Sequence, residues 1–387
     1  GLLAILTIPR EEEPQISVPM VDLMVAAPGL SASDAVELVA KPLETIVKSV
    51  DGVEHVYTQA EDDGVMVTAR FLVGSNPEDA VVRINERLSA NMDKLPIGIA
   101  PPQVTVRGIS DVPIVVLTLT PDAGAQGQWD EQTLLALATR LRTEVAKVDD
   151  VGLTFLVGGK QEQLRITPDT ARLSLHGVSL GALIEAASQA NTPADLGAVT
   201  VRSTNGQAVY LRDVASIEQG PSDDQSRAWR WARSDGGRWN QAPAVSLAIA
   251  KRPGANAVNV SEAVVARVER LKGSLIPAGV TVNVTRNYGE SANEKANELI
   301  FHLALATISI VILIGFAIGW REAAVTAIVI PTTILLTMFA SNFMGFTINR
   351  VSLFALIFSI GILVDDAIVM IENIARHWAL ADRRSRI

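Results

Sequence analysis

Two neighbouring carboxylates, Asp365 and Asp366, lie inside an apolar stretch, 351–371, that is long enough to cross a lipid bilayer. A helix of this length extends about 30 Å, and a span centred on Gly361 places the pair roughly 6 to 8 Å from the middle of the membrane. An Asp at that depth costs about 2.5 kcal/mol or more, even on the mildest insertion scales. An apolar medium and a neighbouring negative charge both favour the protonated form of a carboxylic acid. The pair is therefore predicted to take up and release protons, and a structural intramembrane salt bridge is the alternative.

Two polar residues that follow on the same helix are candidates to support this site. Asn373 lies seven positions after Asp366 and therefore on the same helix face, where it could bond to a neighbouring helix or only pack against it. Glu372 lies about 16 Å from the centre of the span, close to the membrane surface. Arg376 follows Glu372 by four residues, in the favourable order for an ion pair. We expect that ion pair at the cytoplasmic end of the helix.

The elements that must position the pair are helices that cross a membrane. The expected segments are the end of a first span at 1–9, a second span at 299–319, a third at 323–345, a fourth at 351–375 and a tail at 376–387. Arg321 lies between the second and third spans, and four Arg residues follow the fourth. The positive-inside rule puts both regions in the cytoplasm, so residues 10–298 are expected on the other side of the membrane. The short apolar opening and the Arg-rich end indicate a piece of a longer chain.

Residues 10–298 contain no long apolar run and repeat a βαββαβ pattern. The first unit, 10–110, is expected to have strands at 16–26, 53–59, 65–72 and 103–107 and helices at 31–49 and 77–94, with Gly64 at positive φ in the turn between the middle strands. The second unit, 111–298, is expected to have strands at 113–120, 152–157, 161–166, 244–251 and 280–286, helices at 130–148 and 256–275, and an insertion at about 167–243. The fold class is therefore an α+β membrane protein, in which helices cover one face of each sheet.

Composition excludes several classes of function. The net charge of −9 argues against a nucleic-acid partner, and the absence of Cys excludes disulfides, thiol nucleophiles and thiolate metal sites. The four His residues form no recognisable catalytic or metal-binding motif, so we expect neither an enzyme nor a cofactor or metal site. Met20 and Met24 share one face of a strand and are expected in the core, as is Phe155. Trp229, Trp231 and Trp239 alternate with Arg residues in a polar loop that either recognises a partner or packs on itself.

A resemblance to a known family rests on several motifs in order. Gly345-Phe346-Thr347-Ile348-Asn349, followed by Gly361-Ile362-Leu363-Val364-Asp365-Asp366-Ala367-Ile368-Val369-Met370-Ile371-Glu372-Asn373, closely resembles the fourth-span signature of resistance-nodulation-division (RND) efflux permeases. Shorter motifs agree, among them Ala27-Pro28-Gly29, Pro101-Pro102-Gln103-Val104 and Pro253-Gly254-Ala255-Asn256. The resemblance covers nearly the whole sequence. Within the RND family, the branch that exports hydrophobic and amphiphilic compounds fits the double Asp best.

The resemblance implies a homotrimeric pump in the inner membrane of a Gram-negative bacterium that exchanges inward protons for outward substrates. It implies that 10–298 is periplasmic and forms two ferredoxin-like porter subdomains. It also implies that the insertion docks with a periplasmic adaptor (membrane fusion) protein and an outer-membrane channel, and that the basic partner of Asp365 and Asp366 lies in the other half of a longer chain. An exporter of heavy metals and a proton-driven accessory factor for lipid or protein export are the alternatives. The substrate stays open, because the porter region has only Phe71 and Phe155 as phenylalanines.

Overall fold

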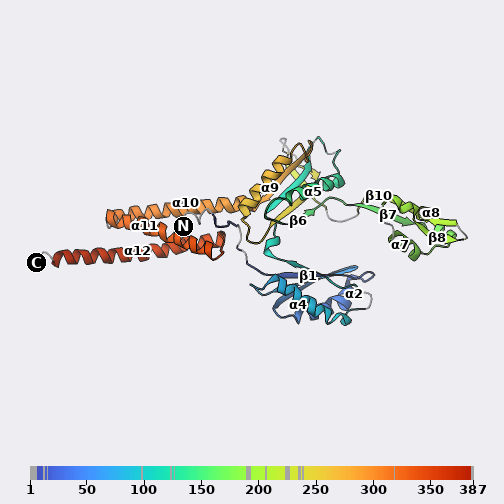
Figure 1. The fold of residues 1–387 in the computed structure, drawn as a ribbon, viewed down its shortest axis with the longest axis horizontal. Coiled ribbons are helices and arrows are strands. Elements are labelled where there is room, and N and C mark those ends of the chain that lie inside the picture. The colour runs from blue at the N-terminus through green and yellow to red at the C-terminus, as the bar shows by residue number, and fades with distance from the viewer. Residues whose placement is uncertain are drawn as a thin grey trace.

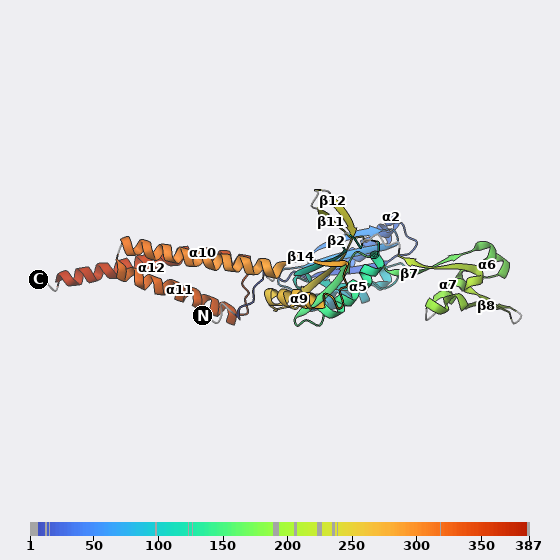
Figure 2. The same cartoon turned by 90° about the horizontal axis from the view of Figure 1, so that it is seen from above.

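The computed structural model shows an elongated molecule in three parts (Figures 1 and 2). Long helices form one end, two α/β units form the middle, and a small insertion domain forms the opposite end. The structure describes residues 7–11, 14, 16–96, 99–122, 124–125, 127–188, 193–204, 207–222, 227–233, 237, 239–317 and 319–384. Residues 1–6 of the expected first span and residues 385–387 of the expected tail lie outside this part of the chain.

The first α/β unit has the βαββαβ element order that the sequence pattern predicts. Its elements are β1 (Met20–Ala26), α2 (Ala32–Ala35), a π-helical turn (Val36–Ala40), α3 (Lys41–Lys48), β2 (Val53–Glu61), β3 (Gly64–Phe71), α4 (Pro77–Ser89), a 3₁₀ turn (Met92–Lys94) and β4 (Gln103–Arg107). The four strands form an antiparallel sheet in the order β2-β3-β1-β4. Val21, Leu23 and Val25 of β1 are buried in a core with Leu43 of α3 and Ile84 of α4. Alternation along β1 therefore fixes which sheet face the helices cover.

The turn between β2 and β3 differs from the expectation at Gly64. The residue with positive φ is Asp63, at 64°, and not Gly64. The Asp63 side chain accepts a hydrogen bond of 2.6 Å from the backbone N–H of Gly29, and the Asp63 N–H donates to the Leu30 carbonyl at 3.0 Å. These bonds hold Asp63 in the left-handed conformation, which Asp tolerates better than most residues.

The second α/β unit repeats the same arrangement with an interruption. Its elements are β5 (Val115–Pro121), α5 (Glu131–Val145), β6 (Val151–Val157), β13 (Val245–Lys251), α9 (Ala257–Leu271) and β14 (Val280–Asn287), after a 3₁₀ turn at Ile109–Asp111. The sheet is antiparallel in the order β14-β5-β13-β6. The core contains Leu117, Leu141, Leu247, Ile249 and Val264. Each unit therefore places its third strand between its first and second strands.

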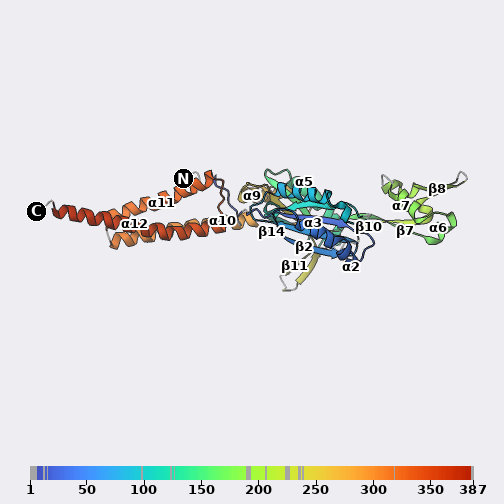
Figure 3. The ribbon, with the colours of Figure 1, turned by 90° about the horizontal axis from the view of Figure 1, so that it is seen from below.

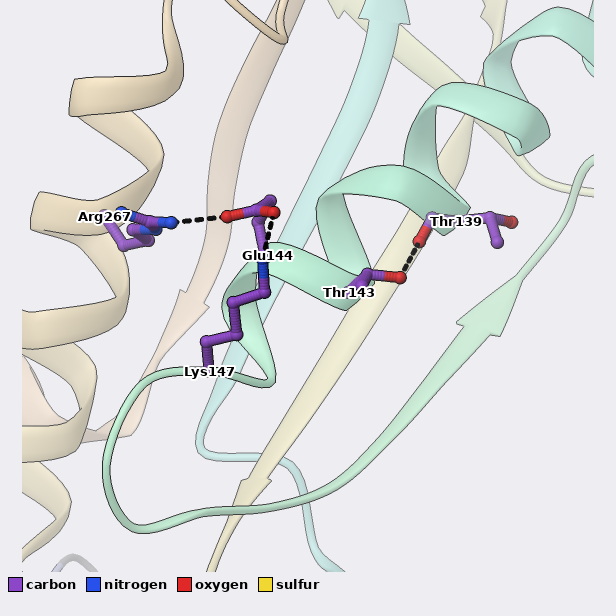
Figure 4. Close-up of polar contacts among 5 residues, drawn as sticks. All are labelled: Thr139, Thr143, Glu144, Lys147 and Arg267. Atoms are coloured by element: carbon purple, nitrogen blue, oxygen red, sulfur yellow. Dashed lines mark hydrogen bonds and ion pairs between the residues drawn. The ribbon is translucent and has the colours of Figure 1, made fainter.

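An ion pair links the two helices of the second unit. Glu144 of α5 binds Lys147, which lies just after the end of the same helix, and Arg267 of α9 (Figure 4). The hydrogen bond from Lys147, and then that from Arg267, hold the pKa of Glu144 below its ordinary value. The contact lies wholly within this unit.

The chain leaves the second sheet earlier than expected. We expected strand 161–166 to follow 152–157 in the unit, but β7 (Glu162–Pro168) pairs with β10 (Ala215–Pro221) in a separate two-stranded sheet. Gly158 and Gly159 have φ of 84° and 80°, and a Cβ on Gly159 would lie 2.8 Å from Leu135 Cβ. The glycines therefore pass closely between packed elements instead of forming a hairpin turn, and the insertion begins near residue 158 and not near 167.

The insertion folds around a small core of its own. After β7 come α6 (Thr170–His176), α7 (Leu180–Ser188), a 3₁₀ turn (Pro193–Ala198), β8 (Thr200–Thr204), β9 (Gln207–Tyr210), α8 (Leu211–Val214) and β10. Leu173, Leu183, Leu211 and Val214 are buried together. The pair β7 and β10 connects this core to the second unit (Figure 1). A separate hairpin, β11 (Trp229–Arg233) and β12 (Trp239–Pro243), follows and projects from the middle of the molecule (Figure 2).

Three long helices form the other end of the molecule. They are α10 (Tyr288–Ala317), α11 (Trp320–Phe343) and α12 (Arg350–Arg384). α10 follows β14 without a loop and begins eleven residues before the expected span at 299–319. Among the described residues, α10 and α11 are the two helices long and apolar enough to cross a membrane, and little of the most apolar part of either is buried. The described apolar run of α12, Arg350–Ser359, is shorter, so the expected crossing at 351–375 stays a prediction.

Candidate functional site

Asp365 and Asp366 are consecutive residues of α12, the helix that packs against both α10 and α11. The Asp366 side chain is exposed in this structure, and so are those of Glu372 and Asn373. The side chain of Asp365 lies outside the described part of the chain. The C-terminal part of α12 extends past the ends of α10 and α11 (Figures 1 and 3). The pair is thus carried on a helix that the neighbouring helices hold mainly by its first half.

The expected ion pair between Glu372 and Arg376 is not formed among the described side chains. Both side chains are exposed. An isolated exposed pair gains little Coulomb energy and loses side-chain freedom, so the favourable spacing alone does not bring these residues together.

The start of α12 is fixed by a buried cap. The Asn349 side-chain oxygen accepts hydrogen bonds of 3.0 Å from the N–H groups of Val351 and Ser352, and the Asn349 N–H donates to the Ser352 hydroxyl at 2.9 Å. The Asn349 side-chain amide also donates to the Thr347 hydroxyl at 3.4 Å. These bonds satisfy the free N–H groups of the first turn and give the helix a defined origin.

A short N-terminal segment, 8–11, is bonded to the loop before α12. The Glu11 N–H donates to the Ile348 carbonyl at 2.8 Å, and the Ile348 N–H donates to the Pro9 carbonyl at 2.9 Å. The Thr347 hydroxyl donates to a Glu11 carboxylate oxygen at 3.4 Å. Ile8 and Ile348 are buried in one apolar cluster with residues of α11 and α12. Segment 8–11 is therefore part of the structure that positions α12.

The same segment reaches the second α/β unit through a buried ion pair. Lys251 Nζ lies 2.7 Å from Glu11 Oε1, and the two residues are only 6% and 5% exposed. Lys251 is the last residue of β13, in the interior of the sheet. Arg10 donates to Asn293 of α10 at 2.6 Å and to Asn297 at 3.2 Å. Segment 8–11 thus contacts all three long helices and the sheet.

Sequence reasoning did not identify Glu11 or Lys251 as functional candidates. Glu11 belongs to an acidic run, 11–13, that directly follows the expected end of a first span at 1–9. The available signal was Lys251 itself, the first charged residue after the apolar strand 244–250. A Lys in that position needs a buried partner, because an unpaired buried charge is strongly unfavourable.

Comparison with known proteins identifies the family. The model of the AcrB/AcrD/AcrF family matches residues 1–198 and 180–386, which together cover almost the whole chain. The chain belongs to the AcrB/AcrD/AcrF family. The resemblance to RND efflux permeases that the motifs indicated is thereby confirmed.

Similar members of the AcrB/AcrD/AcrF family carry the name multidrug resistance protein MdtC. The protein from Pectobacterium atrosepticum is 27% identical, and that from Yersinia pseudotuberculosis is 28% identical. In both comparisons the alignment covers 97% of this chain and 38% of the relative's length. The chain thus spans well under half of these relatives.

In this member of the AcrB/AcrD/AcrF family, the sheet face of the first unit that carries no helix is rich in Met. Met20 and Met24 were expected in the core, but Met24 is 54% exposed and Met66 is its direct partner on β3. Met24 and Met66 line a cavity of about 450 Å³ with Gln59, Gln103 and the acidic residues 61–63. The expectation was wrong because the helices cover the opposite face, which carries Val21, Leu23 and Val25.

The second unit also exposes large side chains outside its core. Phe155 was expected in the core but is 37% exposed, on the same strand face as the exposed Leu153 and Val157. All three Trp side chains of the β11–β12 hairpin are exposed as well. In the outer units of this family member, the sheet faces without helices and the hairpin are therefore apolar or aromatic surfaces open to ligands or to other parts of the protein.

Proposed function

We propose that this chain is part of a proton-driven efflux permease that exports hydrophobic or amphiphilic compounds. Asp365 and Asp366 are the proposed proton carriers, with Asn373 and Glu372 as supporting residues. The observation that carries the proposal is the position of adjacent carboxylates on α12, in a member of the AcrB/AcrD/AcrF family, against two helices long and apolar enough to cross a membrane. Relatives named multidrug resistance proteins support the substrate class.

The exposed apolar helices support a position in the inner membrane. A core helix of a water-soluble protein is mostly buried, whereas only 6% of the most apolar part of α10 is buried. Such a surface requires a lipid or protein partner. In the proposal α12 is a further crossing, residues 10–298 are periplasmic, and Arg376, Arg383, Arg384 and Arg386 near the C-terminal end of the sequence are cytoplasmic.

The outer region is proposed to form two ferredoxin-like porter subdomains and a docking domain. The antiparallel order and the helices on one face of each sheet support the first assignment. The insertion supports the second, because it has its own core and lies at the end of the molecule opposite the long helices (Figure 1). Its proposed partners are a periplasmic adaptor protein and an outer-membrane channel, and the permease is proposed to be a homotrimer.

The energy source in this mechanism is the movement of a proton through the membrane. A proton that enters down the membrane potential releases about 2.3 kcal/mol per 100 mV. Adjacent side chains on α12 face different neighbours, so one Asp can hold a cationic side chain while the other binds the proton. The cation is proposed to come from the part of the relatives' length that this chain does not span. Proton binding then changes the contacts of α12 and so moves the outer units.

The test is export by the full-length permease after single substitutions in the pair. Asp365→Asn and Asp366→Asn should each reduce ethidium export from energised cells to background, without loss of protein from the membrane. Asp93→Asn is the matched control, because Asp93 is an exposed carboxylate outside the long helices. If both variants of the pair export ethidium at the wild-type rate, the proton-carrier assignment is wrong.

A second candidate function is export of a soft metal cation. The direct pairing of Met24 with Met66, on an exposed face that also carries Met20, favours it, because thioethers bind Cu(I) and similar cations. Under this alternative, Met24→Leu with Met66→Leu should remove tolerance to silver ions while ethidium export is unchanged. Unchanged silver tolerance would eliminate this candidate.

A further inference from the structure

The junction between the long helices and the second sheet contains charged groups whose burial needs explanation. Glu11 and Lys251 are almost completely buried, and 240 positions of sequence separate them. A buried ion pair contributes little net stability, because the loss of hydration offsets most of the attraction between the charges. Such a pair does restrict which surfaces can meet and in which register. The pair therefore points to a requirement for a defined contact at this junction.

A series of polar contacts, two long hydrogen bonds and the ion pair itself, connects this pair to the helix that carries Asp366. α12 is a single helix from Arg350 to Arg384, and its cap residue Asn349 lies about 25 Å from Asp366 along the helix axis. Asn349 binds Thr347, and Thr347 binds Glu11. Glu11 then binds Lys251. A shift of α12 along its axis, or a rotation about that axis, therefore moves Asn349, the first residue of this series.

The receiving end of the series lies at a tightly packed point of the sheet. The pairing of β13 with β6 shifts register between Ile249 and Lys251, which re-aims the Lys251 side chain. Gly152 at the start of β6 lies so close that an added Cβ would be 2.8 Å from the Lys251 carbonyl carbon and oxygen. Close-packed elements respond to displacement by moving together. A displacement of Lys251 is therefore transmitted to β6 and β13.

We propose that the Glu11–Lys251 ion pair is the contact through which α12 displaces the second sheet. The inference rests on the proposed function, because it takes the charge state of the Asp365–Asp366 pair as the cause of α12 movement. The second connection, from α10 into β14, is covalent and runs to the edge of the same sheet. The ion pair differs in that it acts on the interior strand β13.

The test measures amide hydrogen exchange in the full-length permease, reconstituted in liposomes. Asp366→Asn imitates the neutral state of that carboxyl, and it should change the exchange rates of residues 245–252 and 151–157 by about fivefold or more, the lower end of typical coupling between two sites. On a Lys251→Met background, the same Asp366→Asn substitution should leave these rates unchanged. The charge exchange Glu11→Lys with Lys251→Glu should restore at least part of the response.

Arg267→Met is the matched control, because the Arg267–Glu144 ion pair lies within the second unit and does not reach the long helices (Figure 4). It should alter local exchange but keep the response to Asp366→Asn. The proposal is overturned if Asp366→Asn has no effect on β6 and β13, or if the effect persists after Lys251→Met. If Lys251→Met does not fold, Glu11→Gln takes its place as the background. The effect of Asp366→Asn on hydrogen exchange in β6 and β13 should then be lost on the Glu11→Gln background, and its persistence overturns the proposal.

Ethidium export and amide hydrogen exchange together distinguish the proton-carrier proposal from the proposal of the Glu11–Lys251 contact. Loss of ethidium export in Asp366→Asn with no change in β13 exchange would support proton-driven efflux and refute this coupling contact. Normal export in Asp366→Asn with changed hydrogen exchange in β13 would refute a proton-carrier role for Asp366 and support the contact.

Discussion

Gly159→Ala tests how closely the chain packs where it leaves the second sheet. A Cβ at this position would lie 2.8 Å from Leu135 Cβ and 3.1 Å from both the Glu131 carbonyl oxygen and Val245 Cγ2. The φ of 80° adds about 1–2 kcal/mol for a residue with a side chain, and overpacking adds about 1–3 kcal/mol. Gly159→Ala should therefore destabilise the contact of α5 with β13 by about 2–5 kcal/mol.

The matched variant for this prediction is Gly74→Ala. Gly74 has a φ of 86°, but an added Cβ would meet no atom within 4 Å, so this substitution should cost only about 1–2 kcal/mol. Hydrogen exchange of α5 and β13 amides in the full-length protein measures the local opening free energy. Gly159→Ala should accelerate that exchange strongly, and Gly74→Ala should leave it unchanged at α5. Equal exchange of α5 and β13 in the two variants would refute the packing argument for the glycine pair.

Four further substitutions test the helix cap, the Glu144 ion pair and the buried Glu11–Lys251 pair. Asn349→Ala should destabilise the first turn of α12 by about 1 kcal/mol, measured as faster exchange of the amides it caps. The folded-state pKa of Glu144 is lowered, so its ion pair adds stability above pH 4.5. This stability is lost as the pH falls through the folded-state pKa. The difference in thermal unfolding temperature between wild type and Glu144→Gln should therefore shrink in acid. Glu11→Gln and Lys251→Met should each lower the free energy of unfolding by about 3–5 kcal/mol. In the same unfolding experiments, the double variant should lose clearly less free energy than the two single variants lose together.

Much of the outer fold could be predicted from local sequence patterns. The alternation in Val21, Leu23 and Val25 and the helical spacing in 31–49 are properties of short segments, so they identify elements without knowledge of their neighbours. The order βαββαβ then follows for both units. The acidic pair of α12 is recognisable for the same reason, although its role as a proton site stays a prediction.

The choice of partners could not be predicted in the same way. β7 follows Gly158-Gly159, which resembles a hairpin turn, but its partner β10 begins about fifty residues later. The ion pair of Glu11 with Lys251 depends on the packing of three separate parts of the chain. Each of these features is decided by contacts between distant residues.

The direct passage from β14 into α10 has a consequence for hybrid proteins assembled from relatives. The Tyr288 N–H still donates to the Ile114 carbonyl at 2.8 Å, as a strand residue would, while Tyr288 is already the first residue of α10. The Asn287 side chain accepts from the Glu290 N–H at 3.1 Å in the first turn. An exchange of segments at this point would have to match sheet register and helix phase at once, because no linker absorbs an error.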